Sequence, residues 1–144
     1  MTADQVATLR AYLSGDNDEF QRLNATLDRS PEGTSAYAAL VLAAFVKAVD
    51  RRFTADTPRS EVVQYVRDVR SRSDRLDEKL DQDAAERLIL SVNTSERVDD
   101  LDARTRFGME LVLLAALIGD ERLSVDDLEA FLAQAHKFAD QLLG

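Results

Sequence analysis

His136 is the only histidine in this sequence, and its imidazole is the side chain whose ordinary pKa lies nearest neutrality. Asp140 follows it by four residues and Glu129 precedes it by seven, so the three side chains fall on one flank of a helix. Such a grouping suits a metal ligand or a general base. The simpler interpretation, which we adopt, is a partly exposed histidine with a carboxylate neighbour one turn away, worth about 0.2–0.5 kcal/mol.

Acidic residues form four clusters that invite comparison with cation sites. The clusters are Asp16/Asp18/Glu19, Asp74/Asp77/Glu78/Asp81/Asp83, Asp99/Asp100/Asp102 and Asp126/Asp127/Glu129. A hard cation needs several oxygens that converge on one point, and none of the clusters has the spacing of an EF-hand. Most of them lie where a helix is expected to begin, where carboxylates accept hydrogen bonds from the first amides. We therefore predict helix capping, with no metal and no cofactor.

The sequence carries no specific catalytic motif. It has no cysteine, which excludes disulfides, thiolate metal sites and cysteine nucleophiles. It also lacks a glycine-rich phosphate loop, a Gly-x-Ser-x-Gly nucleophile and a Glu-x-x-His pair of the kind that builds di-iron bundles. We therefore expect no catalytic residue and no enzymatic activity.

Basic residues concentrate in one stretch. Residues 47–75 hold eight bases and five acids, a local charge of +3, whereas the formal charge of the whole chain is −9. The candidate interaction surface consists of Arg51, Arg52, Arg59, Arg67 and Arg70. Guanidinium forks suit carboxylates and phosphates, so these arginines are candidates for an anion or an acidic partner. The alternative is that they pair with the excess acids of the protein itself.

Charge and hydropathy limit the classes of partner. An acidic chain repels a phosphate backbone, so we expect no nucleic-acid binding. The longest uncharged apolar run, residues 111–119, is about half of the roughly 20 residues that a membrane span needs. The start of the chain shows no signal peptide, and the absence of cysteine fits a reducing compartment. We expect a cytoplasmic protein, and the excess of Arg over Lys is typical of a high-GC bacterial gene.

The elements that carry these residues are predicted to be helices. Helical periodicity covers seven segments, which are residues 3–13, 16–27, 35–52, 57–70, 84–91, 103–118 and 124–142. Residues 71–83 continue the period or form a separate short turn. No segment favours a strand. The length of 144 residues fits one domain, residues 1–144, so we predict an all-α, single-domain antiparallel helical bundle of six or seven helices.

Local signals predict where the helices begin and end. Thr2 with Gln5, and Ser124 with Asp127, have the spacing of capping boxes. Residues 30–33, Ser-Pro-Glu-Gly, predict a loop. Thr57 is the expected cap of the fourth helix with Pro58 at its first position, and Gly119 suits the left-handed position after the sixth. Residues 35–49 and 103–118 are apolar on nearly all sides, which predicts two central helices.

The chain contains a candidate internal repeat. Residues 37–56 align without a gap on residues 107–126, and both end in an Asp-x-Arg-[Phe/Leu]-[Thr/Ser]-x-Asp pattern. If the repeat is real, the two segments begin two related αα-hairpins. The alternative is that any two capped αα-hairpins share such a pattern.

Residues 113–133 resemble the helix–acidic turn–helix hairpins of the tellurite-resistance helical family. The likeness rests on residues 118–124, Ile-Gly-Asp-Glu-Arg-Leu-Ser, and it lacks the Asp-Gly turn that such a hairpin carries. Because it covers a single hairpin, we assign no family from it.

The sequence alone does not define a biochemical function. The absence of a chemical site and the uneven charge favour a non-enzymatic protein-interaction module that binds a protein partner or forms a homo-oligomer. The alternative is a helical protein that binds a small ligand or a divalent metal.

Overall fold

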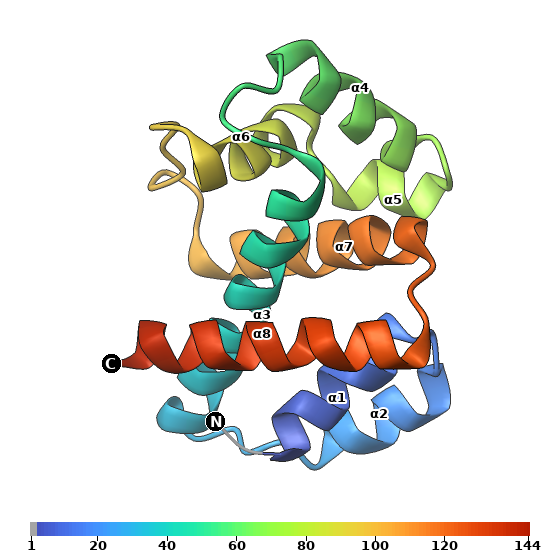
Figure 1. Ribbon diagram of the computed structural model, residues 1–144, viewed down its shortest axis with the longest axis vertical. Coiled ribbons are helices and arrows are strands. Elements are labelled where there is room, and N and C mark those ends of the chain that lie inside the picture. Colours follow the sequence, from blue (N-terminus) through green and yellow to red (C-terminus); the bar gives the residue numbers. More distant parts are fainter. Residues whose placement is uncertain (1–2) are drawn as a thin grey trace. The chain divides into compact units, whose positions relative to one another are not determined.

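The described part of the chain, residues 3–144, is entirely helical apart from its turns and loops (Figure 1). The computed structural model contains eight helices in that range: α1 (Ala3–Leu13), α2 (Asn17–Ala25), α3 (Pro31–Arg52), α4 (Arg59–Arg70), α5 (Asp74–Lys79), α6 (Gln82–Asn93), α7 (Ala103–Glu121) and α8 (Val125–Leu143). The all-α prediction is confirmed. The predicted number of six or seven helices is too low, because the undecided residues 71–83 contain the separate helix α5.

The chain packs as two compact units. One unit comprises the residues up to Lys47 together with Ile118–Gly144, and the other comprises Ala48–Leu117. The chain passes from one unit to the other inside α3 and again inside α7. The two units are called the terminal unit and the central unit below.

The terminal unit contains α1, α2, most of α3, and α8. α1 and α2 form an antiparallel pair in Figure 1, and the rings of Tyr12 and Phe20 lie 5.2 Å apart between them. An ion pair from Arg10 to Glu129 joins α1 to α8. The ammonium group of Lys47 on α3 lies 5.0 Å from the ring centre of Phe138 on α8. Helices in this unit are therefore joined by aromatic and charged contacts as well as by the buried core.

Residues 30–33 were predicted to form a loop, but residues 31–33 form the first turn of α3. α3 begins at Pro31, and the Ser30 hydroxyl accepts a hydrogen bond from the amide of Gly33 at 3.1 Å. Asp28 in turn accepts hydrogen bonds from the amide and the hydroxyl of Ser30, both at 2.9 Å. The side-chain amide of Gln5 donates to the Gly33 carbonyl at 3.0 Å. Proline is favoured in a first helical turn because its missing N–H is not needed there.

The central unit contains the end of α3, then α4, α5, α6 and most of α7. α4 packs against both α5 and α6. Three valines of α4, Val62, Val66 and Val69, are almost completely buried, as the periodicity predicts. Burial of such a stripe stabilises a helix whose β-branched residues have low intrinsic helix propensity.

Capping predictions have mixed outcomes. Side-chain caps are confirmed at Asp16, Asp102 and Ser124, whose oxygens accept from backbone amides three residues later. Asp81 is a further cap, and it starts α6 two residues earlier than predicted. The predicted box of Thr2 with Gln5 involves a residue outside the described range.

Two predicted helix ends are wrong. α4 begins at Arg59 without a side-chain cap, and the hydroxyl of Thr57 instead accepts from the amide of Thr54 at 2.8 Å. Gly119 lies inside α7, and Arg122 has the left-handed conformation, with φ 51°. The sixth predicted helix therefore runs one turn further than its glycine suggests.

α3 and α7 are the two apolar helices of the prediction. Of the residues of α3, Leu40, Val41 and Phe45 are at most 1 % exposed. By length and composition α3 also meets the criteria for a membrane span, and half of its most apolar window is buried in the protein. Since core helices of soluble proteins meet the same criteria, the absence of a membrane association stays a prediction.

The turns of the two candidate hairpins differ. Residues 53–58 join α3 to α4, whereas the shorter segment 122–124 joins α7 to α8. Ser124 caps its helix, but its counterpart Thr54 lies within the longer turn. The internal repeat stays a prediction.

Gly33 provides a test of the α3 start. A Cβ atom at this position would lie 2.6 Å from the backbone oxygen of Asp28, so the Asp28–Ser30 turn must shift. We expect Gly33→Ala to lower the free energy of unfolding by about 1–3 kcal/mol, as overpacking does. Gly119→Ala is the matched control, because its Cβ would meet no atom within 4 Å and should stabilise the helix by about 0.5–1 kcal/mol. Urea denaturation measures the free energy of unfolding of both variants. Equal changes in the two would contradict the close approach of Asp28 to Gly33.

Candidate functional site

Arg52, the last residue of α3, is the arginine of the predicted interaction surface that lies over aromatic rings. Its guanidinium carbon lies 4.4 Å from the ring centre of Tyr65 on α4 and 5.7 Å from that of Phe53. The side chain is exposed, and it forms no ion pair or hydrogen bond with the residues that the structure describes. Stacking on an aromatic face orients a guanidinium while its N–H donors stay available.

The Tyr65 ring, over which the Arg52 guanidinium lies, is held in place by its neighbours. Phe53 is 5 % exposed and Tyr65 is 4 % exposed, and their rings meet edge to face with centres 5.7 Å apart. The side-chain amide of Asn93, at the end of α6, donates to the Phe53 carbonyl at 3.1 Å. Burial and this hydrogen bond therefore hold the start of the turn 53–58 against α4 and α6.

An open hollow of about 490 Å³ lies at this place in the central unit. Its lining residues are Arg52, Phe53, Glu61, Gln64, Tyr65 and Asp68. Asp68 pairs with Arg72 at 2.8 Å, so its charge is already compensated. Glu61 is exposed and its carboxylate has no partner in the described part of the chain. The hollow thus presents one free guanidinium and one free carboxylate beside an aromatic floor.

The other four predicted arginines divide into two kinds. Arg59 lies 4.0 Å from the carboxylate of Glu86, and Arg70 lies 3.1 Å from that of Asp77. Both therefore follow the alternative prediction, in which the arginines pair with acids of the protein itself. Arg51 is exposed and already has an interaction partner. Arg67 is exposed on α4 and has no partner among residues 3–144. The structure therefore leaves Arg52 and Arg67 as the guanidinium groups of this surface without an acid.

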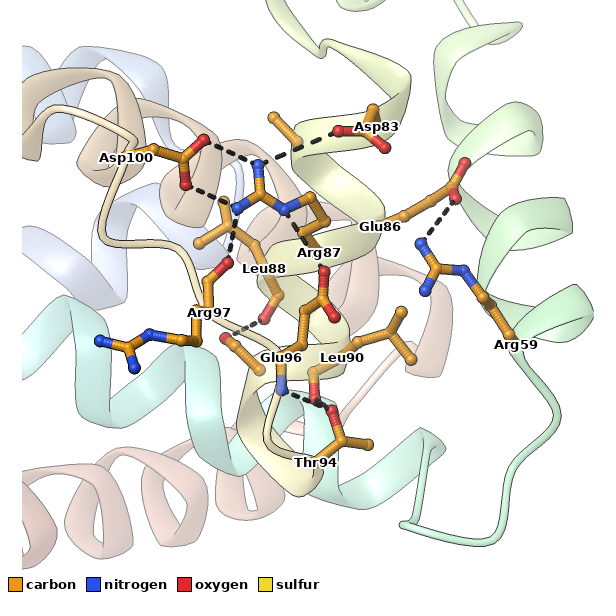
Figure 2. Close-up of polar contacts among 12 residues, drawn as sticks. Arg59, Asp83, Glu86, Arg87, Leu88, Leu90, Thr94, Glu96, Arg97 and Asp100 are labelled. Atoms are coloured by element: carbon orange, nitrogen blue, oxygen red, sulfur yellow. Dashed lines mark hydrogen bonds and ion pairs between the residues drawn. The ribbon is translucent and has the colours of Figure 1, made fainter.

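Arg87 of α6 is the most heavily paired arginine of the central unit, and it shows the opposite situation (Figure 2). Its guanidinium donates to both carboxylate oxygens of Asp100, at 3.0 and 2.6 Å, and to the Arg97 carbonyl at 2.6 Å. Glu96 lies 3.4 Å away. The pairing lowers the pKa of Asp100 below its usual range. This cluster fastens the 94–102 loop to α6 and has little capacity left for a ligand.

His136 forms an exposed pair with Asp140 on the surface of α8, as the simpler interpretation of the sequence predicts. The Nε2 atom of His136 lies 3.6 Å from Asp140, and both side chains are substantially exposed. Glu129 is engaged by Arg10, which lowers the pKa of its carboxyl. Within residues 3–144, no group of three or more His, Cys, Asp or Glu side chains is placed to hold a metal ion.

Glu110 on α7 is a buried acid that no motif in the sequence predicts. It exposes 5 % of its surface, and burial raises the pKa of its carboxyl to about 7, although the charge of Arg106 opposes this shift. The sequence contained a signal, since Glu110 stands three residues after Phe107 and four before Leu114, on the apolar side of the helix. Its raised pKa makes it a group that titrates near neutrality.

No protein-family model, no curated protein and no solved structure matches the chain. The function is therefore argued from its own residues.

Glu110 predicts how stability depends on pH. Its carboxyl has an ordinary pKa of 4.5 when unfolded and about 7 when folded, so the folded state binds its proton more tightly. This tighter proton binding adds about 3 kcal/mol to the free energy of unfolding below pH 4.5. The added stability falls as the pH rises and is lost above pH 7. We expect Glu110→Gln to flatten the fall in unfolding free energy between pH 5 and pH 8 in urea titrations.

The control for this experiment is Glu78→Gln, the same change at an exposed position of α5. It should keep the slope of the wild-type protein over this range. A wild-type slope in the Glu110→Gln variant would show that Glu110 is not the buried acid responsible.

Proposed function

We propose that the protein is a non-enzymatic interaction module that docks a carboxylate-bearing protein segment at the hollow beside Arg52. The observation that carries this proposal is the exposed guanidinium of Arg52, held over the Tyr65 ring without an acidic partner among the described residues. Arginine and tyrosine are the residue types enriched among the strongest contacts of protein interfaces.

The chemistry of Arg52 favours a carboxylate as its partner. A guanidinium donates two parallel hydrogen bonds to a carboxylate, and charge-assisted bonds of this kind are about twice as strong as neutral ones. Because the aromatic contact already restricts the side chain, less conformational entropy is lost on binding. Arg67 is exposed elsewhere on α4 and does not line the hollow, so Arg52 is the cation that the hollow itself supplies.

The chain as a whole supports a protein rather than a nucleic acid at this surface. With a formal charge of −9, the molecule repels a nucleic acid, which carries one charge per phosphate along its whole length, more strongly than it repels a short acidic segment. A short acidic segment needs one or two arginines, which a local charge of +3 over residues 47–75 supplies. The same proposal places the protein in the cytoplasm, without membrane association. It also treats the chain as one antiparallel helical domain in which residues 37–56 and 107–126 begin two related αα-hairpins.

A small-ligand function is the second candidate, because the open hollow presents unpaired charges of both signs. The free Glu61 and Arg52 would then suit a small molecule that bears both an amine and a carboxylate. Thermal melts with glutamate, Mg²⁺, Ca²⁺ or Mn²⁺ separate the candidates, since a ligand of the native state raises the midpoint. A rise with free glutamate would favour the small-ligand function over the protein-docking one.

Replacement of Arg52 tests the proposed docking surface. Acetylated hexaglutamate, titrated at low salt, should shift the backbone NMR resonances of residues 52–68. Arg52→Ala should weaken its binding at least about tenfold, because hydrogen bonds to charged groups contribute about 1.5–3 kcal/mol. Acetylated hexaglutamine, which has the same length and no charge, should leave these resonances unchanged.

Arg97→Ala is the matched control for Arg52→Ala. Arg97 also lies in the central unit and its side chain is 82 % exposed, but it already pairs with Asp99 at 2.6 Å. This variant removes the same charge and should bind hexaglutamate within about twofold of the wild type. Equal losses in the two variants would show that net charge, rather than the hollow, determines binding.

A further inference from the structure

We infer that the segment docked in the hollow carries a basic residue close to its carboxylate, so that the site selects a mixed-charge segment over a purely acidic one. This inference rests on the proposed function, because it specifies the chemistry of the partner at the same surface. The residue that makes the selection is Glu61, which lines the hollow together with Arg52.

The charged residues of the hollow are arranged along one face of α4. Glu61, Tyr65 and Asp68 are spaced by four and then three residues, so they lie on the same side of the helix. The guanidinium carbon of Arg52 lies 4.4 Å from the ring centre of Tyr65, the middle member of this row. The lining therefore comprises one cation at the middle of the row and one carboxylate toward each end of it.

The two carboxylates of the lining are not equivalent. Asp68 pairs with Arg72 at 2.8 Å, one turn further along α4, so its charge is compensated within the protein. Glu61 is exposed and has no such partner among residues 3–144. A carboxylate bound to Arg52 therefore shares the hollow with a free carboxylate, and like charges in one interface oppose binding.

A segment that satisfies both Arg52 and Glu61 needs an acid and a base at a matching separation. Four residues of α-helix rise about 6 Å, and this is the separation of Glu61 and Tyr65 along the axis of α4. In an extended segment, side chains two residues apart lie on one face, about 6.4–6.8 Å from each other. A Lys-x-Glu segment therefore has the spacing to place its carboxylate at Arg52 and its ammonium group at Glu61.

Two pentapeptides, acetylated and amidated at their ends, test the inference on the full chain. They are Lys-Ala-Glu-Ala-Lys and Gln-Ala-Glu-Ala-Gln, and their binding is followed at low salt through the backbone NMR resonances of residues 52–68. The wild type should prefer the lysine-bearing peptide. Glu61→Gln should lower this preference by about two- to fivefold, the range expected for one exposed ion pair.

Hexaglutamate should respond to the same variant in the opposite direction. Removal of the Glu61 charge relieves its repulsion from the docked carboxylates, so Glu61→Gln should bind hexaglutamate about two- to fivefold more tightly than the wild type. A gain in binding also demonstrates that the variant is folded.

Glu78→Gln is the matched control for Glu61→Gln. It removes the same charge at an exposed position of α5 in the central unit, away from the lining of the hollow. Its preference between the two pentapeptides should stay within about 1.5-fold of the wild-type preference, because a charge outside the contact is partly screened.

Two results would overturn the inference. One is a peptide preference that Glu61→Gln leaves unchanged, and the other is an equal change in Glu61→Gln and Glu78→Gln, which would show that net charge decides. In both cases the proposed function stands if Arg52→Ala still weakens the binding of the glutamate-bearing peptides. If no glutamate-bearing peptide shifts the resonances of residues 52–68, the inference and the proposed function both fail.

Discussion

The burial of Phe53 is the constraint on which the candidate site depends. Phe53 follows α3 directly, and its ring is held against Tyr65 of α4 while its carbonyl accepts from Asn93 of α6. These contacts fix where α3 ends relative to α4 and α6 inside the central unit. They also determine the direction of Arg52, the preceding residue, whose guanidinium then lies over the Tyr65 ring.

The absence of an ion pair does not by itself distinguish Arg52, because Arg75 and Arg122 are also exposed and have none among the described residues. What distinguishes Arg52 is how its side chain is held. Arg87 is held by charge, with a bidentate carboxylate and a carbonyl around one guanidinium (Figure 2). Arg52 is held by aromatic rings instead, so its orientation does not require an acid. Its hydrogen-bonding capacity is therefore available to another molecule, and the cost of ordering the side chain has already been met in folding.

The helical fold could be predicted from the sequence because apolar residues recur at helical spacing in almost every segment. Helix ends were harder, since they depend on tertiary packing. Gly33 suggested a loop, but it lies inside α3, and the position requires glycine because Asp28 approaches too closely for a side chain. Gly119 suggested a helix end, yet α7 continues past it and Arg122 takes the left-handed conformation.

The candidate site was predicted only in part, because its members come from two helices and a turn. Arg52 was singled out by charge, but charge alone does not separate it from Arg59 and Arg70, which pair with acids. Tyr65 lies in the middle of α4, and no periodicity in the sequence links it to the end of α3. Such a contact depends on the path of residues 53–58, which the pattern of hydrophobic residues does not determine.

The Nε–Hε resonance of Arg52 in the free protein tests the central claim most directly. Stacking on the Tyr65 ring predicts a ring-current shift of this proton relative to Arg67, which is exposed on α4 and makes no aromatic contact among the described residues. That shift should persist at high salt, because no ion pair holds the side chain. An Arg52 resonance that coincides with that of Arg67, or that moves with salt as a surface ion pair does, would contradict the account.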